Sequence, residues 1–246
     1  MMDGIMAAAL EARNLTKTFG DTTAVNDITL SVKECELFGL LGPNGSGKTT
    51  MIKMLTGQIR PTSGVATVLG RDAAKDPIGV RERVGIIPEQ ETPPSFLTAQ
   101  EYLDFVSAIR KIPDTEQRTA WWFEFLEFSD KKNVLCKDLS RGTRQKLMFA
   151  QAFVHEPALA LIDEPLINFD PIMQEVIKEY LVEYVKKGRT IFISTHILEI
   201  AEEICSEFAI LHTGKLLHTD SVADLTARKE HLPGFFLSLV RKERHA

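Results

Sequence analysis

The stretch that decides the fold is Glu36–Thr50, which reads ELFGLLGPNGSGKTT. It begins with a short apolar run that ends at Leu41, as expected of a buried strand. A glycine-rich segment follows at once, and the residues from there to Gly57 have the pattern of a helix. The sequence therefore predicts a strand, a tight loop and a helix in direct succession.

The glycine-rich segment fits the spacing GxxxxGK[ST], which binds phosphate groups when a strand precedes it and a helix follows. Glycines let backbone N–H groups curl around phosphates, and the helix N-terminus adds positive dipole character. Lys48 can place its charge against the phosphates, and Thr49 can offer a hydroxyl to Mg²⁺. The alternative is a glycine-rich turn with a chance lysine, since average composition gives about one chance match per hundred such chains. The predicted nucleotide contacts of this loop are Gly42, Pro43, Asn44, Gly45, Ser46, Gly47, Lys48, Thr49 and Thr50.

Two acidic residues, Asp163 and Glu164, follow a second apolar run at Ala158–Ile162. Such a pair can also be a strand end with solvated charges. With a phosphate loop upstream, however, Asp163 is expected to hold Mg²⁺ through water, and Glu164 to polarise the attacking water. These residues add a predicted metal ligand and a predicted catalytic group.

The composition is that of an ordinary soluble globular chain. Of its 246 residues, 44% are hydrophobic and 26% are charged, and the formal net charge is −5. A mildly acidic chain is a poor candidate for a nucleic-acid binder, so no nucleic-acid partner is expected. Cys35, Cys136 and Cys205 are far apart and lack zinc-ligand spacing, so they are expected to be reduced thiols.

Strand-like and helix-like segments alternate along most of the chain, which predicts an α/β fold with a mostly parallel central sheet. Residues 92–154 are rich in aromatic residues and in helix signals, including the capping pair Thr98 and Glu101. We expect one domain over residues 1–246. Its expected parts are a nucleotide-binding core at 10–91 and 155–220, a helical subdomain at 92–154 and a C-terminal tail with one helix at 221–246.

Taken together, these motifs and their order resemble the ATP-binding cassette of ABC transporters, from about Leu10 to Asp220. Outside the phosphate loop, the resemblance rests on KTFG at 17–20, IIPEQ at 86–90, DLSRGT at 138–143, the acidic pair at 163–164, Asp170-Pro171 and STH at 194–196. It implies a P-loop NTPase fold with an N-terminal antiparallel β subdomain and a helical insert. The implied cofactors are ATP and Mg²⁺.

The resemblance also implies roles for residues outside the loop. Phe19 would stack on adenine, and His196 would contact the γ-phosphate. Ser140 would donate to the γ-phosphate of ATP that is bound to the phosphate loop of a second chain, while Gly142 permits close approach to that ATP. The implied catalytic residues are Glu164, His196 and Lys48.

Three motifs depart from the family pattern. Glu89 stands where the family usually has glutamine, and Gln90 comes next; either side chain can offer an oxygen to Mg²⁺. The signature-like segment has Arg141 and Thr143 in place of glycine and glutamine. The segment INFD at 167–170 replaces SGLD. Asn168 tolerates left-handed backbone better than most residues, so the turn is expected to persist.

By resemblance, the chain is expected to be an ATP hydrolase that powers a transporter, and an exporter rather than an importer. Its implied partners are a second cassette, identical or different, arranged head to tail, and an integral membrane subunit. The chain would then lie in the cytoplasm, peripherally on the inner face of the membrane. Candidate residues for a groove that receives the membrane subunit are Phe96, Tyr102, Trp121, Trp122 and Phe125.

Two other functions stay open at this point. One is a soluble cassette ATPase that works without a membrane partner. The other is a weakly hydrolytic, regulatory half of a heterodimer, which the altered signature segment motivates.

Overall fold

Two sheets form the framework of the chain. The computed structural model describes residues 8–90 and 93–244. The smaller sheet is antiparallel, in the order β2-β1-β4-β5. Its strands are β1 (Ala8–Phe19), β2 (Thr22–Lys33), β4 (Ser63–Val68) and β5 (Arg71–Asp72). This sheet is the predicted N-terminal antiparallel subdomain.

The larger sheet has the order β10-β9-β3-β8-β7-β6, and only its β10–β9 pair is antiparallel. Its strands are β3 (Leu37–Leu41), β6 (Val84–Ile87), β7 (Leu159–Asp163), β8 (Thr190–Thr195), β9 (Glu207–His212) and β10 (Lys215–Ser221). The predicted mostly parallel sheet is therefore confirmed.

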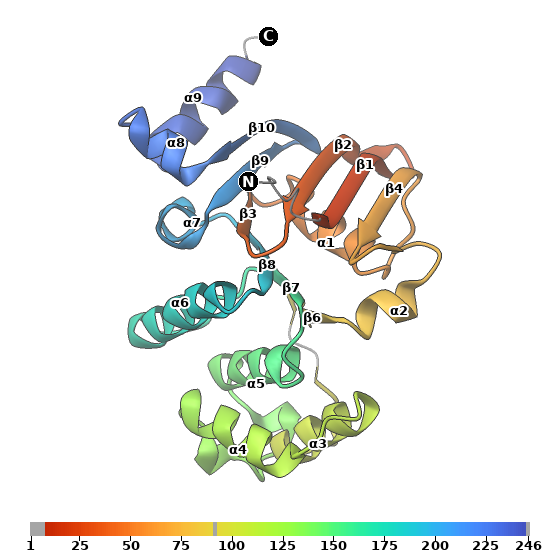
Figure 1. Cartoon of the computed structure of the whole chain (residues 1–246), viewed down its shortest axis with the longest axis vertical. Coiled ribbons are helices and arrows are strands. Elements are labelled where there is room, and N and C mark those ends of the chain that lie inside the picture. The colour runs from red at the N-terminus through yellow and green to blue at the C-terminus, as the bar shows by residue number, and fades with distance from the viewer. Residues whose placement is uncertain (1–7, 91–92, 245–246) are drawn as a thin grey trace, which may run out of the picture.

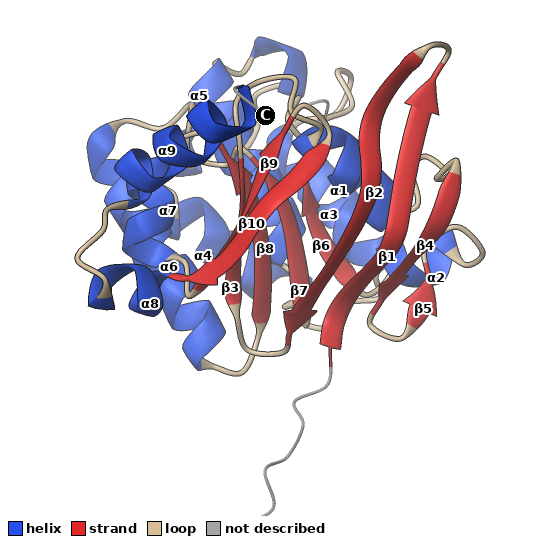
Figure 2. Cartoon of the chain, turned by 90° about the horizontal axis from the view of Figure 1, so that it is seen from above, coloured by secondary structure: helices blue, strands red, loops and turns tan. Residues whose placement is uncertain are grey.

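The central strands are apolar at successive positions because both of their faces are buried. In β7, Leu159 and Leu161 pack toward the antiparallel sheet, whereas Ala160 and Ile162 pack toward the helices of the opposite side. Figure 2 shows this layering, with most helices on one side of the large sheet and the antiparallel sheet beyond α1 on the other. The core layers hold the strand ends, and with them the loops, in fixed positions.

The helices begin where local capping permits. Thr98 and Glu101 form the predicted capping box of α3, with reciprocal bonds of 3.2 and 2.8 Å. Ser140 and Asp170 cap α5 and α6 by accepting backbone N–H bonds. The helices are α1 (Lys48–Leu55), α2 (Pro77–Arg81), α3 (Ala99–Ile109), α4 (Thr115–Phe125), α5 (Arg141–Phe153), α6 (Pro171–Lys186), α7 (Leu198–Ile204), α8 (Val222–Ala227) and α9 (Leu232–Arg244). Two short 3-10 turns lie at Ser129–Lys131 and Cys136–Asp138.

Helices α3, α4 and α5 lie together at one end of the molecule, away from the antiparallel sheet (Figure 1). They fall within the proposed helical subdomain, 92–154, although its first residue, 92, and the preceding residue, 91, lie outside the described part of the chain. No helix in residues 8–90 and 93–244 is long and apolar enough to cross a membrane. The three cysteines are free thiols.

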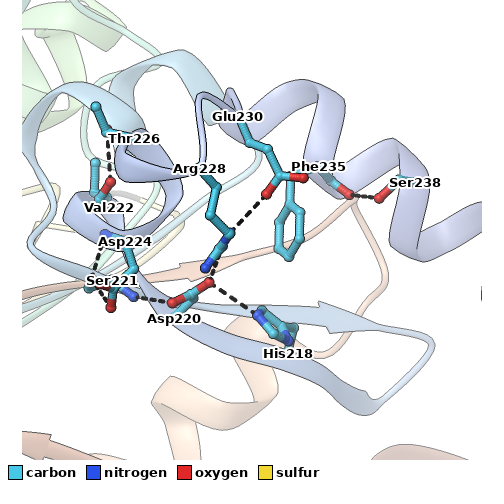
Figure 3. Close-up of polar contacts among 10 residues, drawn as sticks. All are labelled: His218, Asp220, Ser221, Val222, Asp224, Thr226, Arg228, Glu230, Phe235 and Ser238. Carbon is cyan, nitrogen blue, oxygen red and sulfur yellow. Dashed lines mark hydrogen bonds and ion pairs between the residues drawn. The ribbon is translucent and has the colours of Figure 1, made fainter.

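The segment after residue 220 forms two helices rather than the single one expected. Leu225 and Leu232 are fully buried in the main core. Arg228 of the α8–α9 connection bonds to Asp220 at the end of β10, and its guanidinium lies 5.8 Å from the centre of the Phe235 ring (Figure 3). These contacts attach α9 to the edge of the large sheet.

Candidate functional site

The phosphate loop lies at the carboxyl end of β3 and leads into α1, as its sequence predicts. Gly47 has φ of 110°, and a Cβ there would lie 2.4 Å from the carbonyl oxygen of Ala24. A Cβ at Gly42 would lie 2.2 Å from the oxygen of Leu211. The loop is thus wedged between β2 and the β9–β10 hairpin, where no larger residue fits.

The hairpin also holds the loop by hydrogen bonds. The Gly214 N–H donates to the Ser46 carbonyl at 2.9 Å, and the Asn26 N–H donates to the Gly214 carbonyl at 2.8 Å. The Ser46 hydroxyl is buried and has no hydrogen-bond partner within residues 8–90 and 93–244. A polar atom held this way fits a loop whose remaining partner is a bound phosphate.

Lys48 is folded back over the loop, and its side chain is 5% exposed. Its ammonium donates to the carbonyls of Gly42 at 2.7 Å and Pro43 at 3.2 Å. It also lies 3.5 Å from Oε1 of Glu164. A largely dehydrated ammonium is therefore held between the loop and the acidic end of β7.

The candidate metal ligands lie around Thr49. Its hydroxyl donates to Oε2 of Glu89 at 3.3 Å, and Thr49, Glu89 and Asp163 line one small cavity. Burial raises the pKa of Asp163, partly countered by the hydrogen bond that its carboxylate accepts from Ser194. In the part of the chain that is described, no three acidic, histidine or cysteine side chains form a metal cluster. One hydroxyl and one or two carboxylates suit Mg²⁺, which prefers oxygen ligands and takes its others from phosphates and water.

Glu164 is held by the strand beside its own. Its backbone is left-handed, with φ of 49°, and its N–H donates to the Ser194 carbonyl at 3.0 Å. Oε2 accepts a hydrogen bond from the Thr195 hydroxyl at 3.0 Å, and Oε1 is 2.8 Å from Nδ1 of His196. The carboxylate is therefore fixed in orientation at the carboxyl edge of the sheet. The left-handed residue of this region is Glu164, and Asn168 does not have a positive φ.

Ser194 and Thr195 are candidate site residues to which the sequence alone assigned no role. They bond to Asp163 and Glu164 because β7 and β8 pair in parallel, with Asp163 opposite Ser194. The signal in the sequence is the position of both pairs at strand ends. It becomes specific only once the two strands are known to be neighbours.

A cavity of about 380 Å³ lies over the loop. Its lining residues are Phe19, Ala24, Asn44, Gly45, Gly47, Lys48, Thr49, Thr50, Glu89 and Glu164. Phe19 is half exposed, and the Lys17 ammonium lies 4.9 Å from the ring centre. An aromatic face at one side and an ammonium with backbone N–H groups at another suit a ligand with a base and phosphates. Stacking of adenine on Phe19 stays a prediction.

Gln90 lines an adjoining cavity of about 250 Å³, which also includes Glu89 and Asp163. Of Glu89 and Gln90, it is Glu89 that accepts the hydrogen bond from Thr49.

Ser140 and Gly142 are not at the cavity. Ser140 caps α5, and its hydroxyl is bonded to the Thr143 hydroxyl at 2.8 Å. Gly142 lies against the backbone of the 167–170 segment, where a Cβ would come within 3.1 Å of the Asn168 oxygen. Both belong to the helical insert at the other end of the molecule from α1 (Figure 1).

The aromatic residues expected in one groove are split between two places. Phe96 precedes α3 and is 76% exposed. Trp121, Trp122 and Phe125 instead gather around Tyr180 of α6, with ring centres 5.3 to 6.4 Å from it. Trp122 packs mainly in the main core and is only 4% exposed, so it can present little of its surface to a partner.

Comparisons with known proteins agree with this architecture. The sequence model of the ABC transporter family matches residues 25–167. The Nod factor export ATP-binding protein I of Cupriavidus pinatubonensis is 34% identical over 227 residues, which are 89% of this chain and 68% of that protein. An uncharacterized ABC transporter ATP-binding protein of Synechocystis is 35% identical over 84% of this chain, which spans only 59% of that relative's length.

Solved structures are also similar. An ATP-binding subunit of an ABC transporter superposes with a TM-score of 0.88 at 29% identity, covering 94% of this chain and 99% of its own. The cbiO1 protein of Clostridium perfringens, described as part of an ABC transporter complex, gives 0.76 at 26% identity over 91% and 92%. The chain therefore belongs to the ABC transporter family, as one of its ATP-binding cassettes.

Proposed function

We propose that this chain binds ATP with Mg²⁺ in the cavity beside Phe19, hydrolyses it, and powers export through a separate membrane subunit. The observation that carries the proposal is the convergence of Lys48, Thr49 and Glu164 at one cavity. Lys48 and the loop N–H groups would neutralise the phosphates, as phosphoryl transfer requires. Mg²⁺, held by Thr49 and Asp163 with Glu89 or Gln90, would supply charge neutralisation on the phosphate oxygens.

The attacking water would be positioned by Glu164, acting as general base or orienting group. Its carboxylate has one oxygen bonded to Thr195 and the other to His196. His196, with 39% of its side chain exposed, contacts this carboxylate and would also contact the γ-phosphate. Binding and turnover therefore separate experimentally: a variant that keeps Lys48 but neutralises Glu164 should bind ATP and hydrolyse it poorly.

The active unit proposed is a head-to-tail dimer. Ser140 and Gly142 do not line the cavity of their own chain, which supports their use by a second one. Mixing Lys48→Ala chains with Ser140→Ala chains tests this, because each mixed dimer then has one intact site and one doubly altered site. An equal mixture should recover about a quarter of wild-type turnover. Turnover no higher than that of either variant alone would contradict the arrangement.

The membrane partner and the direction of transport rest on likeness alone. Relatives of this chain carry the name Nod factor export ATP-binding protein. We propose a position at the inner face of the membrane, bound to an integral subunit. Purification of the tagged chain from detergent-solubilised membranes should retain a polytopic membrane protein. Recovery of the chain without one would support a soluble cassette ATPase instead.

A second candidate, the weakly hydrolytic half of a heterodimer, is favoured by one contact. The Ser140 hydroxyl is bonded to Thr143, which stands where the family usually has glutamine. A hydroxyl engaged in this way is less available to a γ-phosphate. If this limits the chain, Thr143→Gln should raise ATP turnover. Unchanged or lower turnover would argue against this second candidate.

A further inference from the structure

Two adjoining cavities lie at the amino-terminal ends of the parallel strands, whereas the phosphate loop lies at their carboxyl-terminal ends. Their volumes are about 500 and 340 Å³, and both are lined by Arg118, Glu156 and Arg189. Glu156 and Arg189 come just before β7 and β8, whereas the phosphate loop follows β3. These strands are parallel and five or six residues long, so the two edges are on the order of 17 Å apart. The cavities therefore form a place separate from the nucleotide site.

The larger cavity has aromatic walls. They come from three helices, α4, α5 and α6, and comprise Trp121, Trp122, Phe153, Tyr180 and Tyr184. Trp121 is 47% exposed, so part of its ring surface is accessible. Its ring centre is 6.4 Å from that of Tyr180. Trp121 and the half-buried Tyr180 therefore provide the accessible apolar ring surface, whereas Trp122, Phe153 and Tyr184 are at most 6% exposed.

The smaller cavity carries an excess of positive charge. Its basic residues are Arg110, Lys111, Arg118 and Arg189, against the two carboxylates Glu82 and Glu156. His155, which also lines it, adds no charge, because burial and the nearby Arg110 lower its pKa to about 4. This excess stands out in a chain whose formal net charge is −5.

Part of this charge is not neutralised by carboxylates. Arg118 pairs with Glu156 at 3.0 Å. Arg110 instead donates to backbone carbonyls, including that of Glu82 at 3.1 Å. Neither Lys111 nor Arg189 makes an ion pair within residues 8–90 and 93–244 (the range over which contacts are described). Lys187 and Arg189 both border the aromatic cavity without an ion pair among the described residues, but only Arg189 also lines the smaller cavity, and so it joins the two environments.

We propose that these cavities bind a small planar aromatic anion, with its ring against Trp121 and Tyr180 and its charged group at Arg189. The aromatic walls would bury the ring, and the guanidinium would give charge-assisted hydrogen bonds to a carboxylate, sulfonate or phosphate. The ligand would touch both α4 of the helical insert and the start of β8 in the core. The inference does not depend on ATP binding.

The tryptophans provide a direct readout, because the chain has only two and both line the aromatic cavity. Anilinonaphthalene sulfonate is a suitable probe, since tryptophan emission excites it. Its uncharged counterpart, phenylnaphthylamine, has the same rings without the anion. Each would be titrated against the full chain with excess ADP, with excitation of tryptophan and detection of probe emission. The sulfonate should bind at one site, at least about tenfold more tightly than the amine.

Variants assign the site. Arg189→Gln should weaken the sulfonate about tenfold and leave the amine unchanged, whereas Trp121→Leu should weaken both. Lys215→Gln, which removes an exposed cation on β10, should change neither. Circular dichroism checks that each variant is folded. Equal affinities for the two probes, or sulfonate binding unchanged in folded Arg189→Gln, would overturn the proposal.

Discussion

Replacing Thr195 by valine tests how the carboxylate of Glu164, the proposed hydrolytic residue, is held. The hydroxyl of Thr195 donates to Oε2 of Glu164 at 3.0 Å, and both side chains are largely buried. A hydrogen bond to a charged group contributes about 1.5–3 kcal/mol, which corresponds to about 10- to 150-fold in rate if it acts only in the transition state. Because His196 holds the other oxygen, we expect the lower end, a roughly tenfold loss of turnover.

The assay is steady-state ATP hydrolysis together with equilibrium ATP binding. Thr195→Val should lower kcat and leave the Kd for ATP nearly unchanged, since Thr195 does not line the cavity. It should also lower the free energy of unfolding by about 1–3 kcal/mol, because the Ile197 N–H loses its acceptor.

Thr195→Ser is the matched control, because it keeps the hydroxyl and removes only a methyl group. It should retain most of the turnover. The reasoning fails if valine leaves kcat within twofold of wild type, or if serine is as damaging as valine.

Three further changes have expected outcomes. Gly47→Ala should destabilise the loop by about 1–3 kcal/mol and weaken ATP binding, because the φ of Gly47 is 110° and a Cβ would meet backbone. The control is Gly188→Ala, which also strains a left-handed backbone but places its Cβ in open space, and which should lower only the thermal midpoint. Phe19→Ala should weaken ATP binding about 5- to 150-fold by loss of stacking, and equal affinity in a filter-binding assay would refute stacking. Arg228→Gln should lower the urea midpoint at pH 7. Burial opposes ionisation of Asp220, but hydrogen bonds from Arg228 and His218 lower its pKa overall. The folding free energy that these bonds contribute is present above the unfolded pKa of about 3.9 and is lost as the pH falls from there through the lower folded pKa. The difference in stability between wild type and Arg228→Gln should therefore shrink as acid is added.

Features encoded locally could be predicted from sequence. The phosphate loop, the buried strand before Asp163 and the capping pair Thr98–Glu101 each depend on residues within one short segment. Their positions in the structure agree with those predictions. The helix starts at Ser140 and Asp170 were predictable for the same reason.

Features set by neighbouring segments could not be predicted. The bonds from Ser194 and Thr195 to the acidic pair depend on the parallel register of two strands 31 residues apart. The sequence singled out Trp122 as an aromatic residue of the helical segment, but it could not say that this ring packs against Tyr180 of α6. The second C-terminal helix likewise depends on the packing of Leu225 and Leu232 in the main core, which involves residues far away in the sequence.

The most direct test of the account is ATP turnover by Glu164→Gln, with ATP binding measured on the same preparation. The two side chains have nearly the same shape, so the bonds from Thr195 and the loop geometry should persist. Loss of the carboxylate should cut turnover by about 100-fold or more, as for removal of a general base, while the Kd for ATP stays near the wild-type value. Near wild-type turnover in this variant would contradict the assignment of Glu164 as the hydrolytic residue.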